Sequence, residues 1–368
     1  MAFAPVSPLT VDGFPKFLTV VYHRMIESAI IAFIDLNLSD RFVHAAPHQG
    51  FTLDEIIGTD DHSTWNKDVL YRILRACVVT GVVKQVNDDK HFALTESGAM
   101  LTSNHPSHAR DLIKFVAEPE TTSALSKLVN VTRRESISGI DLTFGVDFYT
   151  MVALPAHEQY SHTFNGALTA ISQYVGDRLA FAVDFGRFAT VLDLGGNIGA
   201  FLVQVLQYNP SVKHGIVFDM PRVIKEVNKG EVFQSRHISK DRYSFVAGDI
   251  FDPSTIPQVD AYLIKQLLHD FSDEKVVTIL SAIRQANETS SRKTITIFIV
   301  EHVILGDGAV SDWQSIAMDM LMTSIIDSGK ERSQEEYQQL LEQAGFHFKQ
   351  LYPLQAPNSI IEAVWIKH

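Results

Sequence analysis

The hydrophobic positions follow two different patterns along this chain of 368 residues. Before about residue 190 they recur mainly at helical spacing, whereas after it short apolar runs alternate with helical stretches. The second pattern predicts strands at 190–194, 214–219, 243–248, 259–265, 294–303, 346–353 and 359–367, and helices at 199–208, 221–229, 273–288, 313–325 and 334–344. Such alternation is typical of an α/β fold with a doubly wound, mostly parallel, seven-stranded sheet. The last two strands must pair antiparallel because residues 355–358 are too short for a parallel crossover.

The N-terminal part begins with a long apolar helix. Between Phe17 and Asp40 the apolar side chains recur at helical spacing and continue around much of the helix: Tyr22, Met25, Ile26, Ala29, Ile30, Phe33 and Leu36. A helix with so wide an apolar face needs more cover than its local core supplies. We therefore expect a partner helix or a second subunit to pack against it.

Residues 52–95 predict a winged helix. Thr52 and Glu55 form a capping box that starts a short helix, and Asn66–Thr80 predicts a longer helix. Two short strands follow, at 82–86 and 91–95, joined by a polar turn. This shape serves either DNA binding or dimerisation. The longer helix carries few basic side chains and the turn is acidic, so we expect dimerisation.

Composition narrows the classes of function. The formal net charge of −12 argues against a nucleic-acid partner, because binding a phosphate backbone needs Lys and Arg. The one cysteine, Cys77, excludes an internal disulfide framework and fits a small buried hydrophobe on a helix. We find no signal-peptide pattern and no run of consecutive apolar residues long enough to span a membrane. These features predict a cytoplasmic protein with no membrane partner.

The segment VLDLGGNIG, residues 191–199, is the most informative in the chain. An apolar strand ends in Gly195, Gly196 and Gly199, a helical pattern follows, and the next strand closes on Asp219. Strand, glycine turn, helix, strand and acid is the order of a nucleotide-binding βαβ unit. Asp193, inside the first strand end, would repel a pyrophosphate. A ligand with a positive charge therefore fits this turn better.

Ligands of doubly wound sheets bind at the carboxyl ends of the strands, so the residues there predict the ligand. Asp219 suits the two hydroxyls of a ribose, Asp249 suits the exocyclic amine of adenine, and Phe271 can stack on a flat base. The chain has no P-loop lysine and lacks the full glycine spacing of a dinucleotide site. An adenosine ligand that carries an amine and a sulfonium fits this acidic lining, which points to S-adenosylmethionine.

Seven motifs in order resemble those of one family. They are IDLNL (34–38), the winged helix, VLDLGGNIG, VFDMPRVI (217–224), VAGDIFD (246–252), LIKQLLHDFSDE (263–274) and GKERSQEEY (329–337). This set resembles the plant-type and acetylserotonin-type small-molecule O-methyltransferases. The resemblance implies a winged-helix dimerisation domain at 1–105, a helical connector lining the substrate pocket at 106–186, and a Rossmann-like class I methyltransferase domain at 187–368. It also implies a homodimer formed through the N-terminal domain.

The resemblance assigns roles to single residues. His269 matches the family's catalytic base, and Glu301 and Glu331 match the two acids that flank it. A histidine with an ordinary pKa of about 6.5 can accept a proton from a hydroxyl near neutrality, and a carboxylate on its other nitrogen would hold the tautomer. The predicted cofactor residues are Asp193, Gly195, Asp219, Met220, Asp249, Ile250, Lys265 and Phe271. We expect S-adenosylhomocysteine as the product and no metal ion.

The sequence departs from the family pattern at the glycine turn and in the acceptor pocket. Asn197 stands where a third glycine is usual, and asparagine tolerates left-handed dihedral angles better than most residues. Phe271 replaces the usual tryptophan. The residues expected to face the acceptor, a small and probably aromatic hydroxylated metabolite, are Phe164, Leu168, Met318 and Met322. Leu168 departs from the plant enzymes, which argues against plant phenylpropanoid acceptors.

Three functions remain open at this level. The first is O-methyl transfer to a small metabolite. The second is a cyclase, pericyclase or lyase that keeps S-adenosylmethionine bound as a cation without transferring its methyl group. The third is a DNA-binding regulator that senses a ligand. Structural alternatives also remain for single residues: His269 as a hydrogen-bonding loop residue, Glu301 at a strand end in solvent, and Glu331 paired with Lys330 or Arg332 on the surface.

Overall fold

The computed structural model describes residues 13–42, 50–86, 90–134, 137–226, 230–305, 313–354 and 358–367. These residues form two compact units. The first unit contains residues up to Glu118 together with Gln159–Ala170, and the second contains Pro119–Glu158 and Ile171–His368. The division into functional domains at 105 and 186 stays a prediction.

The first unit contains the predicted winged-helix elements. Its helices and strands are α1 (Phe14–Asp35), α2 (Leu38–Phe42), α3 (Leu53–Ile57), η2 (His62–Thr64), α4 (Lys67–Val79), β1 (Val83–Val86), β2 (His91–Leu94), α5 (Glu96–Ala99), α6 (Ala109–Ala117) and the first part of α11 (Glu158–Ala182). β1 and β2 pair antiparallel, with Val83 opposite Leu94. The capping box of Thr52 and Glu55 forms as predicted, and Cys77 is fully buried. Residues 87–89 of the predicted turn lie outside the described residues.

The long N-terminal helix is shorter than the apolar stripe predicted. Asn37 adopts a left-handed backbone with φ 53°, which ends α1 and turns the chain into α2. Within this unit Phe33 and Ile34 are buried, but much of the apolar face of α1 is open. The large apolar side chains of α1 that remain exposed are Phe14, Phe17, Val20, Val21, Tyr22 and Met25.

Helix α1 is also long and apolar enough to cross a membrane, by length and composition alone. This differs from the expectation based on uninterrupted apolar runs, because a mean over 18 residues tolerates charged side chains such as Arg24 and Glu27. Core helices and signal sequences pass the same test. The absence of a membrane partner and the cytoplasmic location therefore stay predictions.

The second unit is built around the predicted seven-stranded sheet. Its strands are β3 (Thr190–Leu194), β4 (His214–Asp219), β5 (Tyr243–Ala247), β6 (Ala261–Lys265), β7 (Thr294–Glu301), β8 (His347–Pro353) and β9 (Ser359–Ile366). Their order is β5-β4-β3-β6-β7-β9-β8. The first five strands pair parallel, whereas β9 pairs antiparallel with both β7 and β8, as predicted. The α/β fold class is confirmed.

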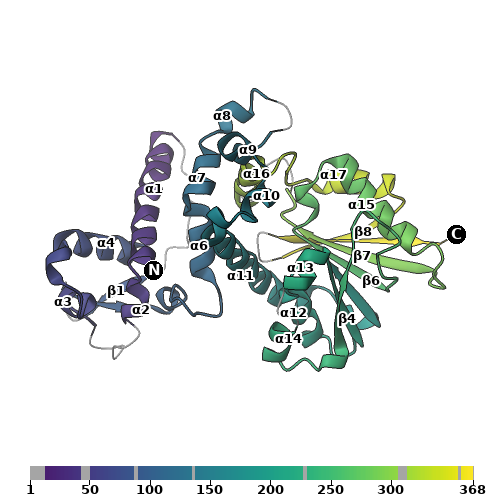
Figure 1. Cartoon of the computed structure of the whole chain (residues 1–368), viewed down its shortest axis with the longest axis horizontal. Coiled ribbons are helices and arrows are strands. Elements are labelled where there is room, and N and C mark those ends of the chain that lie inside the picture. The colour runs from purple at the N-terminus through teal and green to yellow at the C-terminus, as the bar shows by residue number, and fades with distance from the viewer. Residues whose placement is uncertain are drawn as a thin grey trace. The chain divides into compact units, whose positions relative to one another are not determined.

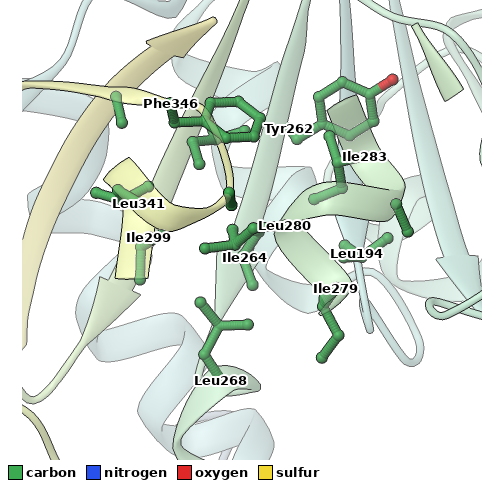
Figure 2. Close-up of a cluster of buried hydrophobic side chains, with 14 of the residues drawn as sticks. Leu194, Tyr262, Ile264, Leu268, Ile279, Leu280, Ile283, Ile299, Leu341 and Phe346 are labelled. Atoms are coloured by element: carbon green, nitrogen blue, oxygen red, sulfur yellow. The ribbon is translucent and has the colours of Figure 1, made fainter. Parts of the chain in front are cut away.

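Helices cover both faces of this sheet (Figure 1). They are α12 (Ala200–Tyr208), α13 (Pro221–Glu226), α14 (Glu231–Ser235), α15 (Asp273–Ala286), α17 (Gln334–Gln343) and the rest of α11, with the short turns η4 (Phe185–Arg187), η5 (Lys240–Arg242) and η6 (Leu268–Asp270). On one face, α15 and α17 pack Ile279, Leu280 and Leu341 against Ile264 and Ile299 (Figure 2). On the other face, α12 and α14 contribute a separate apolar cluster that includes Phe201 and Phe233.

A group of short helices completes the second unit. They are α7 (Pro119–Leu125), α8 (Leu128–Val131), α9 (Gly139–Phe144), α10 (Phe148–Val152) and η3 (Pro155–His157), and α16 (Trp313–Ile325) packs against α7, α8 and α9. The predicted connector is therefore mainly helical, and part of it packs with α16 of the same unit.

The sheet order also determines where a ligand would bind. β3 lies between β4 and β6, so the connections leave β3 and β6 toward opposite sides of the sheet. Ligands of open α/β sheets bind at such a switch point, beyond the carboxyl ends of the strands. The glycine turn follows β3 and the His269 loop follows β6, which brings both predicted motifs to this point.

Candidate active site

The glycine turn after β3 needs the residues it contains. Gly195 and Gly199 have φ of 75° and 86°, in the left-handed region that favours glycine. A Cβ atom at Gly199 would lie 2.6 Å from the ring of Phe233, and one at Gly195 would lie 3.2 Å from Leu267. Because Leu267 is in the His269 loop, the turn and the loop are in close contact.

Asn197 also adopts the left-handed backbone, with φ 50°. Asparagine was expected to tolerate left-handed dihedral angles at this position, and it adopts them. Its backbone N–H donates a 2.9 Å hydrogen bond to Oδ2 of Asp219, and the N–H of Met220 donates to Oδ1 at 2.7 Å. These two bonds orient the Asp219 carboxylate at the end of β4. Burial raises the pKa of Asp219, and the two backbone donors oppose that shift.

Replacing Asn197 tests the backbone of the turn. We expect Asn197→Ala to raise the dissociation constant for S-adenosylmethionine about fivefold to thirtyfold, since alanine in this conformation costs about 1–2 kcal/mol. Asn197→Gly is the matched control and should bind within about twofold of the parent, because glycine adopts φ 50° freely. Isothermal titration calorimetry measures both. Equal affinities for the alanine and glycine variants would contradict a role for the left-handed turn.

Asp193 and Lys265 influence each other electrostatically near the turn. Asp193 is 2% exposed, and its Oδ2 has no hydrogen-bond partner among the described residues. Burial raises the pKa of Asp193 to about 7, with Lys265 opposing the shift and Asp219 adding to it. Burial also lowers the pKa of Lys265, against the charges of Asp193 and Glu301. A buried carboxylate oxygen without a donor suits a cationic ligand group.

The predicted adenine end of the site is also assembled. Asp249 follows β5, and its Oδ1 accepts a 2.9 Å hydrogen bond from the N–H of Phe251. Phe251 and Phe271 meet edge to face, with ring centroids 5.6 Å apart. Ile250 packs against the same core as Phe271. Phe251 received no role from the sequence, although it lies within the motif that supplied Asp249.

Three residues from separate segments meet at the end of β6 and β7. Nδ1 of His269 lies 2.9 Å from Oε1 of Glu331 and 3.5 Å from Oε2 of Glu301. Nε2 of His269 lies 3.5 Å from Oδ1 of Asp270. Glu301 and Glu331 are 0% and 3% exposed, so neither lies in solvent as the structural alternatives required. Nε2 is therefore the ring nitrogen that Glu331 does not engage.

The carboxylates dominate the electrostatics of this histidine. Burial opposes the charged imidazolium, but Glu301, Glu331 and Asp270 outweigh it and raise the pKa of His269 to about 10. This differs from the ordinary value assumed from the sequence. Burial raises the pKa of Glu301 to about 7, with His269 opposing the shift and Glu331 adding to it. Burial lowers the pKa of the neighbouring His302 to about 3, so that ring stays neutral.

Backbone and core contacts hold the His269 loop. Oε1 of Glu301 accepts the N–H groups of Leu267 and Leu268, each at 3.0 Å. The Leu268 side chain is fully buried at the edge of the core (Figure 2). His269 therefore sits between a residue anchored in the core and Asp270, on a short turn with little freedom.

Arg332 clamps the same loop from the other side. It is 0% exposed and donates to the carbonyl oxygens of Leu268 at 3.0 Å and Phe271 at 2.6 Å, and to Asp273 at 2.9 Å. Arg332 therefore does not pair with Glu331, which was the structural alternative considered for that acid. Lys330 likewise pairs with Asp273 and Glu336.

Glu331 is held by a helix that the sequence did not connect to it. Its backbone N–H donates a 2.9 Å hydrogen bond to Oδ1 of Asp319 on α16. α16 also carries the predicted acceptor residues Met318, which is partly buried, and Met322, which is 3% exposed. Phe164 and Leu168 belong to the first unit, where Phe164 packs against Phe115 with ring centroids 5.3 Å apart. Their role toward the acceptor stays a prediction.

Sequence reasoning missed Arg332, Asp319 and Tyr149 as parts of this site. Tyr149 on α10 donates a short hydrogen bond to Oδ2 of Asp270. A signal was present for Arg332, which lies within the GKERSQEEY motif. No local pattern links Tyr149 to Asp270, because the two residues are 121 positions apart.

The triad also offers metal-ligating atoms. One ligand atom from each of His269, Glu301 and Glu331 lies within 4.8 Å of the others. Oε2 of Glu301 and Oε2 of Glu331 have no hydrogen-bond partner within the described part of the chain. Nδ1 already has a hydrogen-bond partner in Glu331, and an imidazole that acts as a base without a metal ion needs no further ligand there. The expectation of a metal-free reaction stays a prediction.

The chain is similar to known proteins over most of its length. The family model described as "O-methyltransferase domain" matches residues 124–347. The 8-amino-8-demethylriboflavin N,N-dimethyltransferase of Streptomyces davaonensis is 30% identical over 80% of this chain and 80% of that enzyme. The mitomycin biosynthesis 6-O-methyltransferase of Streptomyces lavendulae is 29% identical over 91% of this chain and 89% of that enzyme. Human N-acetylserotonin methyltransferase, solved with S-adenosylmethionine, has the same fold, with a TM-score of 0.78 and 22% identity over 97% of this chain and 99% of that chain.

Proposed function

Because this chain belongs to the O-methyltransferase domain family, as an S-adenosylmethionine-dependent O-methyltransferase of small metabolites, we propose that it methylates an aromatic hydroxyl with His269 as the general base. One observation supports this role most directly. Nδ1 of His269 is engaged by Glu331 at 2.9 Å, which leaves Nε2 as the basic nitrogen. A base oriented by a carboxylate is a common arrangement for removing a proton from a hydroxyl.

The mechanism follows from the residues of this chain. Neutral His269 carries its hydrogen on Nδ1, where the N–H forms a hydrogen bond to Glu331. Nε2 then accepts the hydroxyl proton of the acceptor. The acceptor oxygen then forms its bond to the methyl carbon as the carbon–sulfur bond breaks. S-adenosylmethionine, when bound, supplies the methyl group and leaves as S-adenosylhomocysteine. Glu301 and Glu331 stabilise the imidazolium that remains, and the buried site aligns the reactants away from water.

The strength of the base suits a phenol. An unperturbed phenol has a pKa of about 10. Burial works against the imidazolium of His269, yet the three carboxylates raise its pKa to about 10 as well. The carboxylates thus make the imidazole a stronger base than usual, and a phenol is a much stronger acid than an aliphatic alcohol, which supports a phenol as the acceptor.

The cofactor residues have separate proposed tasks. Asp219 would hold the ribose hydroxyls, while Asp249, Ile250 and Phe271 would hold the adenine. Gly195, Met220 and Lys265 would contact the rest of the cofactor around the glycine turn. The buried Oδ2 of Asp193, which lacks a donor among the described residues, supports a cationic group beside it.

Methyl transfer is tested with labelled S-adenosylmethionine and a panel of phenols, catechols and aromatic amines. We expect labelled product and an equal amount of S-adenosylhomocysteine with a phenolic acceptor. The amines belong in the panel because one relative is named for methylation at nitrogen. Conversion of an acceptor without release of S-adenosylhomocysteine would favour the cyclase, pericyclase or lyase function instead. Salt-sensitive retention of DNA would favour a regulator.

We also propose that the protein is a homodimer that covers α1. Phe17, Val21 and Met25 recur every four residues, so they share one side of the helix, and they are 66%, 50% and 62% exposed. An apolar face of this kind on a single chain is typical of an interface.

The dimer is tested by analytical ultracentrifugation of the parent and of a Val21→Glu, Met25→Glu double variant. We expect a dimeric parent and a mostly monomeric variant, because two carboxylates would enter an apolar interface. Val129→Glu, at a residue 63% exposed on α8, is the matched control and should leave the mass unchanged. A monomeric parent, or binding of the parent to lipid vesicles, would show that α1 has a different partner.

A further inference from the structure

Tyr149 connects the short helix α10 to the candidate base. Its hydroxyl donates a short hydrogen bond to Oδ2 of Asp270, the residue after His269. Both residues belong to the second unit. The contact therefore joins the helical segment ahead of the sheet to the loop that follows β6.

Helix α10 holds Tyr149 in place. The side chain of Asp147 caps the helix by accepting the backbone N–H of Thr150 at 3.0 Å. Phe148 and Met151 are 2% and 0% exposed, so two residues of this short helix, one before and one after Tyr149, are anchored in the core. The phenol thus extends from a short but well-fixed element.

Asp270 divides its two oxygens between Tyr149 and His269. Oδ2 accepts the tyrosine hydroxyl, while Oδ1 lies 3.5 Å from Nε2 of His269. The side chains of His269 and Asp270 are each 9% exposed, so both are nearly buried but still reachable. Without the tyrosine, the carboxylate could rotate about its side-chain bonds and move Oδ1 away from Nε2.

We propose that Tyr149 is a positioning residue that holds Asp270 with Oδ1 beside Nε2 of His269, where the carboxylate stabilises the imidazolium formed during proton transfer. This proposal rests on His269 acting as the base. Glu301 and Glu331 face Nδ1, whereas Asp270 is the carboxylate next to the nitrogen that receives the proton. Positive charge that develops at Nε2 is therefore met first by the group that Tyr149 holds.

The charges around the pair agree with this role. Burial raises the pKa of Asp270, and both His269 and the Tyr149 hydrogen bond oppose that shift and favour the carboxylate. Partial burial of Tyr149, which is 39% exposed, and the charge of Asp270 raise the pKa of Tyr149 above its ordinary value, so the phenol stays a donor. The other charged groups that act on these residues are Glu301 and Glu331 on His269, and Asp219 and Arg222 on Tyr149.

Tyr149→Phe removes only the hydroxyl and tests the proposal. We expect kcat on the plateau above the acid limb to fall about tenfold with KM within about twofold, because the lost contact acts on the base more than on acceptor binding. We also expect the acid limb of the rate profile and the imidazole titration of His269 to move to lower pH by about half a unit or more, since the imidazolium loses support. The titration is followed by NMR of ¹³C-labelled histidine, assigned with a His269 variant. Tyr174→Phe, at a tyrosine 49% exposed on α11, is the matched control and should change neither.

Two outcomes would overturn the proposal in different ways. If the His269 titration is unmoved, Tyr149 does not act through Asp270, whatever happens to the rate. If the titration moves but kcat and its acid limb do not, His269 is not the base, and the proposed function loses its mechanism together with this inference. A rise in KM alone would make Tyr149 a binding residue instead.

Discussion

Replacing His269 with alanine is expected to abolish methyl transfer, lowering kcat by about 10²- to 10⁴-fold, while S-adenosylmethionine binds almost as tightly as before. The loss follows from the proposed role of Nε2 as the base that takes the hydroxyl proton. Most of the predicted cofactor residues lie at the carboxyl ends of β3, β4 and β5. The hydrogen bonds of Asp219 and Asp249 there do not involve the imidazole ring. Single-turnover transfer from labelled cofactor measures the rate, and calorimetry measures the affinity.

The pH dependence distinguishes this role from a structural one. The parent should become faster as the pH rises, because the neutral imidazole is the active form and the carboxylates hold its pKa above the ordinary value against the effect of burial. The His269→Ala variant should lose this acid limb along with most of its rate. His347→Ala, at an exposed histidine on β8, is the control and should keep the parent profile. Parent-like activity in His269→Ala would show that another group removes the proton.

The sheet and the glycine turn were predictable because local physics specifies them. Buried parallel strands are short apolar runs, and their predicted ends agree with the structure within two residues. Gly195 and Gly199 occupy left-handed backbone positions that other residues avoid. Since parallel strands place their carboxyl ends together, Asp193, Asp219 and the residues after β6 were expected to share one edge.

The electrostatics of the site were less predictable from sequence. The ordinary pKa assumed for His269 ignored burial and three neighbouring carboxylates, whose distances depend on tertiary packing. Tyr149 illustrates the same limit, since its partner lies 121 positions away and neither residue has a pattern that points to the other. Asn37 shows a local limit: the apolar stripe continues past it, but its left-handed backbone ends α1.

Arg332→Ala is expected to lower the free energy of unfolding by about 3–5 kcal/mol and to reduce methyl transfer severely. The guanidinium is fully buried and donates to the carbonyl oxygens of Leu268 and Phe271. Its removal leaves both carbonyls without this donor and opens a cavity beside the His269 loop. The lost ion pair with Asp273 contributes less to this cost than a fully buried ion pair would, because Asp273 is 47% exposed. Urea unfolding followed by circular dichroism measures the stability.

Lys330→Ala provides the matched control because it removes a neighbouring cation. Lys330 is 37% exposed and pairs with Asp273 and Glu336, so its loss should change stability by less than about 1 kcal/mol. Arg332→Lys keeps the charge but not the planar fork, and it should recover only part of the stability. If Arg332→Ala were as stable as Lys330→Ala, the loop would be held by Leu268 and Glu301 alone. In that case the geometry of His269 would depend on the core and on β7, and loss of activity in Arg332→Ala would need a direct role for the guanidinium.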